Sequence, residues 1–331
     1  DHRDLHSFPT RRSSDLRVRG GDRRYLVLFT TPAEMRGLGG FIGNWAELTA
    51  VDGDVELTRS GRIEELRPPL GAPPYAISGP QDYLDRWGRF EVGTYVQDTT
   101  FSPDFPSVAQ VWEEIYPQTI GGSEIDGVIV VDPYALAAFM TFTGPITVPG
   151  YPTPLTSENA ADILLREQYL TFDDDREGRT DFLDDATRLT FEALTTGDLP
   201  GPREVTEVLG PMVAQGRLLM NSVVPDEQDF FTRIDLDGAL PAVNGDFLSV
   251  TTQNSGNNKI DIFLHRESRY AVRYDPDTGR VQGEVTVTLR NDAPASGLPS
   301  VVIGNRDTER IPVGANLMYL SVYTPWEIVA A

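Results

Sequence analysis

The amino-acid sequence predicts an α/β protein in which a mixed sheet flanked by helices is followed by an incomplete antiparallel β domain. Three observations predict this class. The run at 128–131 is fully apolar, which is typical of a strand that is buried on both faces, and a predicted helix follows it directly. Amphipathic helical segments recur between residues 104 and 234. From about Phe247 the apolar residues recur at every second position, which is typical of half-exposed antiparallel strands.

The segment 125–148 predicts a strand, a turn, a helix and a second strand. The apolar, β-branched run is followed by Asp132, a residue that can cap a helix, and by a proline, which fits the first helical position. Gly144 and Pro145 end the helix. We therefore expect 127–131 to be a central strand and 133–143 to be a helix that packs on its sheet.

The elements before this segment are predicted from apolar runs and turn signals. Residues 25–29 form an apolar run typical of a buried strand. An Asp-Gly pair at 52–53 predicts a hairpin between strands at 45–50 and 54–58. Residues 67–80 are rich in proline and glycine and are expected to form a loop. Helices are expected over 104–116, 156–169, 180–196, 203–214 and 226–234.

The last part of the chain predicts a separate β domain. We expect the α/β domain to span 17–265 and the β domain to span 266–331, where the chain stops before a sandwich of this kind is complete. Strands are expected at 247–253, 259–264, 270–274, 281–289 and 317–323.

Residues 1–16 match the in-frame translation of a DNA sequencing adapter and are excluded from the prediction of the fold. On this interpretation the reading frame is truncated upstream, so a missing membrane anchor carries no information. It also leaves His265 as the only native histidine, because His2 and His6 lie in the adapter-like segment.

Composition narrows the classes of function. The chain has 331 residues and a formal net charge of −22, which argues against nucleic-acid binding. Lys259 is the only lysine, so a cationic site here consists mainly of guanidinium groups, which suit bidentate contacts with phosphate. Cysteine is absent, which excludes disulfides, thiolate nucleophiles and cysteine-ligated metals.

Several separated motifs resemble one known family. They are Arg24-Tyr-Leu-Val-Leu-Phe29, the segment 32–43 with its Gly-Gly-Phe-Ile-Gly, Ser102-Pro-Asp-Phe-Pro106, the segment 125–148, and Gln253-Asn-Ser-Gly-Asn-Asn-Lys-Ile-Asp261. In this order they resemble the actinobacterial family catalogued as domain of unknown function 4012. The resemblance implies a location on the extracytoplasmic face of the plasma membrane, with the membrane anchor in the missing N-terminal part.

A more distant resemblance is to the LytR-CpsA-Psr ligases, which move glycopolymers from a polyprenyl pyrophosphate carrier onto peptidoglycan. In those enzymes arginines hold the pyrophosphate, and acidic residues help to hold magnesium. The resemblance, together with the arginine content, implies a set of five anion-binding candidates. They are Arg36, Arg62, Arg166, Arg179 and Arg188.

The acidic half of the ligase pattern is largely missing. Ile63 stands where an aspartate is expected after Arg62, and Gln168 replaces the partner of Arg166. We therefore expect no cofactor and no metal, with magnesium as the alternative. The secondary candidates for holding it are Asp104 and Asp181.

Four other features have a structural explanation that we prefer. The glycines at 39–43 are expected at a close approach of two backbone segments rather than at a ligand. The acidic residues around 173–175 lack the spacing of a calcium loop and are expected to be solvated. His265 has no catalytic motif around it, and 254–258 is expected to be a hairpin loop. The absence of a Gly-x-Ser-x-Gly motif argues against a serine hydrolase.

Three functional hypotheses follow. The first is an extracytoplasmic envelope protein that binds a polyprenyl-(pyro)phosphate or a glycopolymer without metal-dependent transfer. The second is an active glycopolymer phosphotransferase whose acids come from Asp98, Asp104 or Asp181. The third is a non-catalytic interaction module that works through its β domain. Arginines that line one deep, apolar-walled cavity favour the first hypothesis, and arginines scattered over the surface favour the third.

Overall fold

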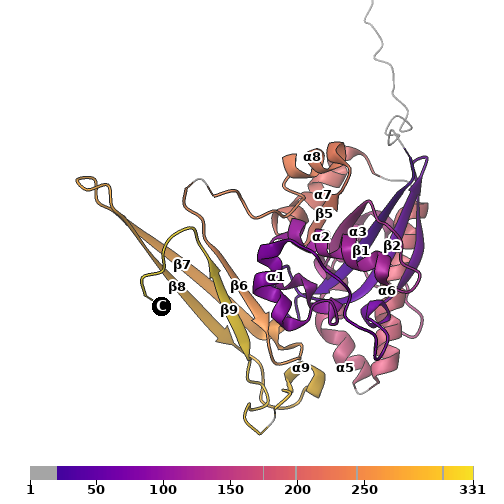
Figure 1. Ribbon diagram of the computed structural model, residues 1–331. Helices are drawn as coiled ribbons and strands as arrows, with labels where there is room; N and C mark the ends of the chain where they lie inside the picture. The colour runs from indigo at the N-terminus through magenta and orange to yellow at the C-terminus, as the bar shows by residue number, and fades with distance from the viewer. Residues whose placement is uncertain (1–20, 174, 198–199, 244, 308, 331) are drawn as a thin grey trace, which may run out of the picture.

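The fold is described by a computed structural model covering residues 21–173, 175–197, 200–243, 245–307 and 309–330. An α/β unit stands beside a set of long antiparallel strands from the last part of the chain (Figure 1). The adapter-like segment 1–16 lies outside the described residues. Within the described part of the chain, no helix is both long enough and apolar enough to cross a membrane.

The α/β unit is built on a five-stranded mixed sheet, as predicted. Its strand order is β3-β2-β1-β4-β5, and only β1 and β4 run parallel to each other. All five residues of β4 are buried between its two neighbours, which confirms the predicted central strand. The strands are β1 (Arg23–Thr31), β2 (Phe41–Val51), β3 (Asp54–Arg62), β4 (Gly127–Val131) and β5 (Leu218–Ser222).

The turn after β4 begins α3 (Pro133–Thr143) as the sequence predicts. The Asp132 carboxylate accepts hydrogen bonds from the backbone N–H groups of Tyr134 at 2.9 Å and Ala135 at 3.0 Å, which caps the helix. Gly144 ends the helix with a φ of 73°, a conformation that favours glycine.

The second strand expected after this helix is absent. Ile146 instead makes an isolated bridge with Leu155, and the parallel partner of β4 is β1, from the start of the chain. Prolines at 145, 149, 152 and 154 explain the difference, because each lacks the N–H group that a strand needs for its ladder.

Helices cover both faces of the sheet, because side chains alternate along β1. Leu26 and Leu28 face one cluster with α1 and α2, and Val27 and Phe29 face the other with α3 and α6. The remaining helices lie around these two layers (Figure 1). The bounds are α1 (Gln81–Trp87), α2 (Phe105–Ile115), α4 (Ala160–Asp162), α5 (Gln168–Phe172), α6 (Arg176–Thr196), α7 (Pro202–Ala214) and α8 (Pro225–Arg233).

The helix predicted over 156–169 is interrupted. A five-residue π-helix, Ile163–Glu167, separates α4 from α5. Such π turns are rare and occur mostly as single turns, frequently at functional sites. This one places Leu164 and Gln168 along the pocket described below.

The hairpin between β2 and β3 is confirmed. Asp52 and Gly53 both have positive φ, at 52° and 94°, as a two-residue hairpin turn of the primed type requires.

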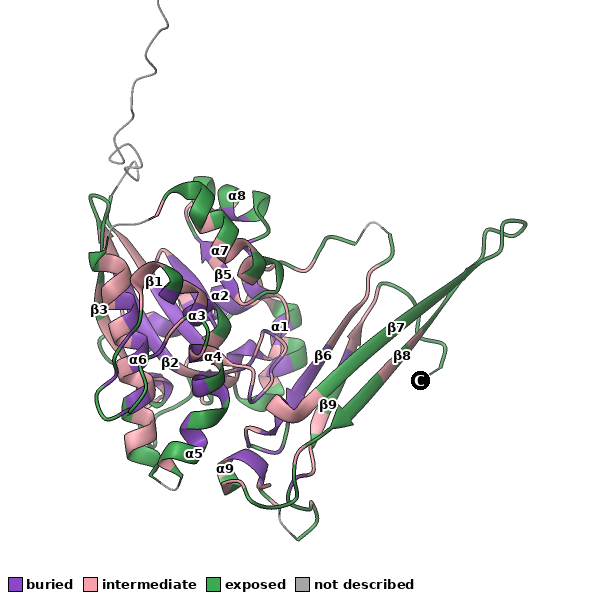
Figure 2. Cartoon of the chain, turned by 180° about the vertical axis from the view of Figure 1, so that it is seen from behind, coloured by how far each residue is buried: buried purple, intermediate pink, exposed green. Residues whose placement is uncertain are grey.

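The last part of the chain forms two antiparallel pairs. β6 (Ser249–Asn254) pairs with β9 (Met318–Tyr323), and β7 (Leu264–Tyr274) pairs with β8 (Val281–Asn291). A short helix, α9 (Ser300–Ile303), lies between β8 and β9. The β7–β8 hairpin extends away from the α/β unit and is largely exposed (Figure 2). β6 precedes the predicted domain boundary at residue 265 and β9 follows it, so this strand pair joins the two predicted domains. The boundary itself stays a prediction.

The strand expected at 259–264 is wrong. Residues Ile260–Phe263 form a 3₁₀ turn, held by the buried carboxylate of Asp261. That carboxylate accepts hydrogen bonds from Met35 N at 2.8 Å, Asn254 Nδ2 at 2.9 Å and Asn316 Nδ2 at 2.8 Å. The turn therefore joins the first loop of the α/β unit to the β pairs.

Candidate functional site

A pocket of about 820 Å³ opens where the parallel strands β1 and β4 end. The last residues of β1, at 29–31, line it together with the last residue of β4 and the two that follow, at 131–133. In open α/β sheets, ligands bind at the carboxyl ends of parallel strands, so this is the expected edge for a site. We call it the β1–β4 pocket.

Part of the wall is apolar and comes from several elements. Leu136 belongs to α3, Leu164 to the π-helix and Leu183 to α6. Phe29 and Val131 contribute from the sheet, and Leu136 and Leu164 are buried. An apolar wall of this kind suits a hydrocarbon group.

The pocket is far more basic than the rest of the chain. Six basic and five acidic side chains line it, in a protein with a net charge of −22. The basic residues are Arg36, Arg67, Arg176, Arg179, Lys259 and Arg306, and the acidic residues are Glu34, Glu64, Asp98, Asp132 and Asp173.

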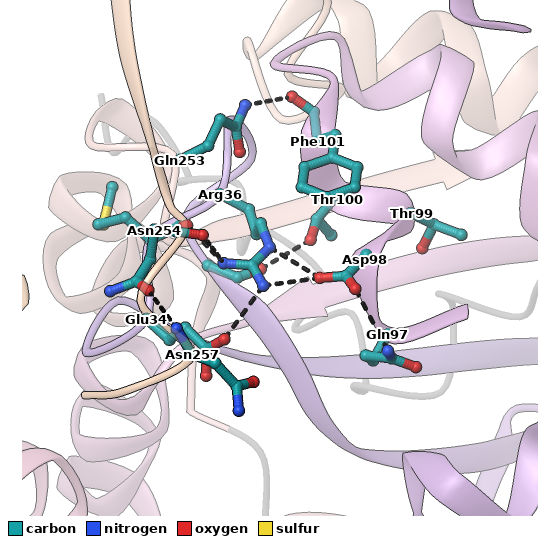
Figure 3. A network of polar contacts seen from close by, with 12 residues as sticks. Glu34, Arg36, Gln97, Asp98, Thr99, Thr100, Phe101, Gln253, Asn254 and Asn257 are labelled. Atoms are coloured by element: carbon teal, nitrogen blue, oxygen red, sulfur yellow. Dashed lines mark hydrogen bonds and ion pairs between the residues drawn. The ribbon is translucent and has the colours of Figure 1, made fainter. Parts of the chain in front are cut away.

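Two of the acidic residues are neutralised by a buried network on one side of the pocket (Figure 3). Glu34 accepts from Arg36 Nη2 at 3.1 Å and from Lys259 Nζ at 2.5 Å. Asp98 accepts from Arg36 Nε at 2.8 Å and lies 2.7 Å from its Nη2. Burial by itself would raise the pKa of Glu34, but the charges of Lys259 and Arg36 outweigh it and hold this pKa below its ordinary value.

The network engages every nitrogen of the Arg36 guanidinium. Its Nη1 donates to the carbonyl oxygens of Met35 at 2.9 Å and Asn254 at 3.3 Å, and Nε and Nη2 contact Asp98 and Glu34. Arg36 is also buried, with 6% of its surface exposed. It therefore joins the loop after β1 to β6, and all of its N–H donors already have partners within the protein.

Asp132 is neutralised on another side. Its Oδ2 accepts from Arg217 Nη1 at 2.6 Å, while its other oxygen caps α3. Burial raises the pKa of Asp132 above its ordinary value, although the backbone N–H of Ala135 and the charge of Arg217 oppose this. Of the five acidic lining residues, Glu64 and Asp173 are left to face the other arginines.

Arg179 is the sequence-predicted residue that remains suited to an anion. It projects from α6, its guanidinium lies 5.3 Å from the centre of the Tyr169 ring, and it lines the β1–β4 pocket. Within the described residues it forms no ion pair. The sequence did not indicate Arg67, Arg176, Arg306 or Lys259 as site residues; the one available signal was that Lys259 lies within the Asn-rich motif 253–261.

The other three candidate arginines lie elsewhere. Arg62 pairs with Asp181 at 2.6 Å, and Arg188 pairs with Asp185 at 2.7 Å and Glu192 at 2.8 Å. Arg188 follows Arg179 by nine residues on α6, about 13 Å further along the helix axis. The two arginines therefore cannot share one small anion.

Arg166 lines a different pocket. It lies 3.8 Å from Asp162 and 5.9 Å from the centre of the Phe263 ring. Leu164 and Gln168, two positions before and after it, line the β1–β4 pocket instead. Residues two apart on a helix point in nearly opposite directions, which explains why Arg166 does not join them.

The secondary metal candidates have structural partners. Asp104 caps α2 by accepting from Ser107 N at 3.1 Å, and it also accepts from Leu240 N at 2.9 Å. Asp181 pairs with Arg62. Across the described ranges, no three His, Cys, Asp or Glu side chains gather in a metal-binding cluster.

The remaining sequence features also find structural partners. A Cβ at Gly40 would collide with the carbonyl of Thr31, so this glycine allows a close backbone approach. Asp175 caps α6 by accepting from Gly178 N at 2.9 Å. His265 lies 3.2 Å from Asp292 on the exposed β7–β8 hairpin.

A known protein family matches the segment that contains the strands β1 to β4 and the helix α3. Residues 20–169 match the family described as "Protein of unknown function (DUF4012)". The resemblance to this family is thus confirmed for residues 20–169, which hold four of the five motifs; the motif at 253–261 lies outside the match. The matched segment contains the strand ends of the pocket and the wall residues Leu136 and Leu164. No curated protein matches the chain.

Solved structures similar to this chain include three bacterial proteins. Lin1025 from Listeria innocua is 11% identical, with 80% of this chain and 91% of that chain covered and a TM-score of 0.32. Protein gbs0355 from Streptococcus agalactiae is 13% identical, with 65% and 73% covered and a TM-score of 0.37. TagV from Bacillus subtilis is 11% identical, with 69% and 87% covered and a TM-score of 0.31. At these TM-scores the similarity carries no argument about what the chain binds.

Proposed function

We propose that this DUF4012 chain binds a polyprenyl-linked (pyro)phosphate carrier of a cell-envelope glycopolymer in the β1–β4 pocket. The proposal includes a location on the extracytoplasmic face of the membrane and no metal-dependent transfer. The observation that carries it is the position of arginines beside an apolar wall, at the carboxyl ends of two parallel strands.

A polyprenyl pyrophosphate has two chemically different parts, and the pocket offers a surface for each. The isoprenoid chain would lie against Leu136, Leu164 and Leu183. Binding there would remove the apolar surface of the isoprenoid chain from contact with water, which is favourable. The pyrophosphate would contact Arg179 together with Arg67 and Arg176, because guanidinium groups form bidentate, charge-assisted hydrogen bonds with phosphate oxygens.

The charge balance of the pocket supports an anionic ligand. Glu34 and Asp98 are held by Arg36 and Lys259, and Asp132 is held by Arg217. The acidic side chains that could repel a phosphate are therefore mostly engaged. The arginines that remain give this part of a strongly acidic protein a local positive field.

We propose no metal-dependent transfer because of the positions and partners of the carboxylate side chains that could bind a metal ion. Of the acids considered for an active transferase, Asp104 and Asp181 do not line the pocket, and Asp98 is bonded to Arg36 and Gln97. A magnesium site needs several free oxygen ligands, and these residues do not supply them together.

Calorimetric titration tests the proposal. A short polyprenyl pyrophosphate is expected to bind with a dissociation constant in the micromolar range, which corresponds to a binding free energy on the order of −8 kcal/mol. Inorganic pyrophosphate and the uncharged polyprenol should each bind at least roughly tenfold more weakly, since each uses one part of the pocket. Added Mg²⁺ should leave the affinity unchanged, and an assay for polymer transfer should show no product.

Two outcomes would replace the proposal. Absence of binding by the polyprenyl pyrophosphate would favour the interaction module, in agreement with the dispersed positions of Arg62, Arg166 and Arg188. Transfer that depends on Mg²⁺ would instead identify the chain as a phosphotransferase.

A further inference from the structure

A second hollow of about 430 Å³ lies beside the β1–β4 pocket, between the α/β unit and the β6–β9 pair. The α/β unit contributes Trp87, Phe90, Tyr95 and Phe101, and β9 contributes Tyr319. Five aromatic side chains therefore line one small space. We call it the aromatic hollow.

Three of the five aromatic side chains pack against one another. The rings of Trp87 and Phe101 are stacked with their centres 5.4 Å apart, and Phe90 lies 5.1 Å from Phe101. Trp87 is buried, whereas Phe90, Tyr95 and Tyr319 are 36%, 45% and 54% exposed. Phe90, Tyr95 and Tyr319 therefore keep part of their surface exposed beside a packed aromatic pair.

Polar groups that have no hydrogen-bond partner among the described residues surround these rings. They are the side chains of Ser255, Asn257 and Arg306 and the hydroxyl groups of Tyr95 and Tyr319. Gln253, by contrast, is already bonded to Phe101 (Figure 3). It also accepts from Gly37 N, and Asn254 is bonded to the turn at 256–258.

Asn257 is held in an unusual backbone conformation beside the hollow. Its φ is 56°, in the left-handed region, which asparagine tolerates better than most residues. Its side chain is labelled beside the Arg36 network in Figure 3, at the border between the hollow and the β1–β4 pocket. A carboxamide in this place offers both donors and an acceptor.

We infer that the aromatic hollow binds pyranose units of an uncharged or N-acetylated saccharide. A pyranose ring has an apolar C–H face, which packs on an aromatic ring, and a rim of hydroxyl groups, which both donate and accept hydrogen bonds. Exposed rings of Phe90, Tyr95 and Tyr319 beside amide and hydroxyl groups match both properties.

The hollow and the β1–β4 pocket are adjacent and share lining residues. Tyr95, Gln97, Asn257 and Arg306 line both of them. A saccharide in the hollow could therefore be attached to a pyrophosphate in the pocket. That the saccharide is attached to a pyrophosphate rests on the proposed function. That the hollow binds a saccharide rests on the residues of the hollow alone.

Titration with soluble oligosaccharides, followed by saturation-transfer NMR, tests the inference without lipid or phosphate. The probes are N-acetylated chitotriose and cellotriose. We expect at least one of them to bind the wild-type protein with a dissociation constant on the order of a millimolar or tighter. The variants Tyr95→Ala and Tyr319→Ala should each bind it roughly fivefold to tenfold more weakly, the scale of one lost aromatic contact.

Tyr274→Ala is the matched control. Tyr274 is 63% exposed on β7 and lines neither the hollow nor the pocket, so this variant should bind the saccharide like the wild type. An equal loss in the control, or no loss in Tyr95→Ala and Tyr319→Ala, would overturn the inference. So would concentration-dependent self-association that Tyr319→Ala abolishes, because a second copy of the chain would then occupy the hollow.

A variant of the β1–β4 pocket separates this inference from the proposed function. Arg179→Ala should weaken polyprenyl pyrophosphate binding and leave chitotriose binding unchanged. If neither saccharide binds while the polyprenyl pyrophosphate still does, the saccharide inference is wrong and the proposed function stands. If a saccharide binds and the polyprenyl pyrophosphate does not, the proposed function fails alone.

Discussion

Replacing Val130 with aspartate is expected to prevent the α/β unit from folding. Val130 is 1% exposed in β4, inside the sheet, with β1 on one side and β5 on the other. An unpaired carboxylate there costs several kcal/mol, or is forced to stay protonated through a large rise in its pKa. Circular dichroism and gel filtration of Val130→Asp should show an unfolded or aggregated protein.

Val55→Asp provides the matched control. Val55 belongs to β3, at the edge of the same sheet, and is 41% exposed. The same substitution there should change the free energy of unfolding by about 1 kcal/mol or less, because water still reaches the new charge. A soluble, cooperatively folded Val130→Asp protein would contradict the position of β4.

The second large effect is expected at Arg36. Arg36→Ala should lower the free energy of unfolding by about 3–5 kcal/mol, because it leaves the buried Glu34 and the partly buried Asp98 with fewer partners. Urea denaturation measures the change. Arg62→Ala is the control: its pair with Asp181 is largely exposed, so a loss of about 1 kcal/mol or less is expected. Similar losses in the two variants would contradict a structural role for the Arg36 network.

The same network predicts how stability depends on pH. The pKa of Glu34 in the folded protein is lower than in the unfolded chain. Its contribution is therefore present above the unfolded pKa, about 4.3, and is lost as the pH falls through the folded value. Arg36→Ala removes part of the charge that lowers this pKa, so it should make the contribution of Glu34 smaller.

Local sequence signals predicted the elements that depend on neighbouring residues. The apolar run of β4, the Asp132 cap and the Asp-Gly turn at 52–53 each determine their own backbone geometry, and all three are confirmed. The prediction of a mixed sheet flanked by helices was based on these elements. The second strand expected in the segment 125–148 and the strand expected at 259–264 are wrong, because distant partners or prolines decide the conformation there.

The site was less predictable because side-chain direction depends on tertiary contacts. Of the five candidate arginines, Arg36 and Arg179 line the β1–β4 pocket, and Arg36 is fully engaged by acidic side chains and carbonyl oxygens. Nothing near Arg67 or Arg306 in the sequence indicates that the fold brings them to the same pocket, since 239 positions separate them.

The most direct test of the account compares two arginines on the same helix. Arg179 and Arg188 both belong to α6, but only Arg179 lines the β1–β4 pocket, whereas Arg188 pairs with Asp185 and Glu192. In titrations with a short polyprenyl pyrophosphate, Arg179→Ala should weaken binding by about 1.5–3 kcal/mol, the value of a charged hydrogen bond. Arg188→Ala and Arg166→Ala should bind like the wild type. Unchanged binding by Arg179→Ala, or an equal loss in Arg188→Ala, would contradict the assignment of the β1–β4 pocket as the pyrophosphate site.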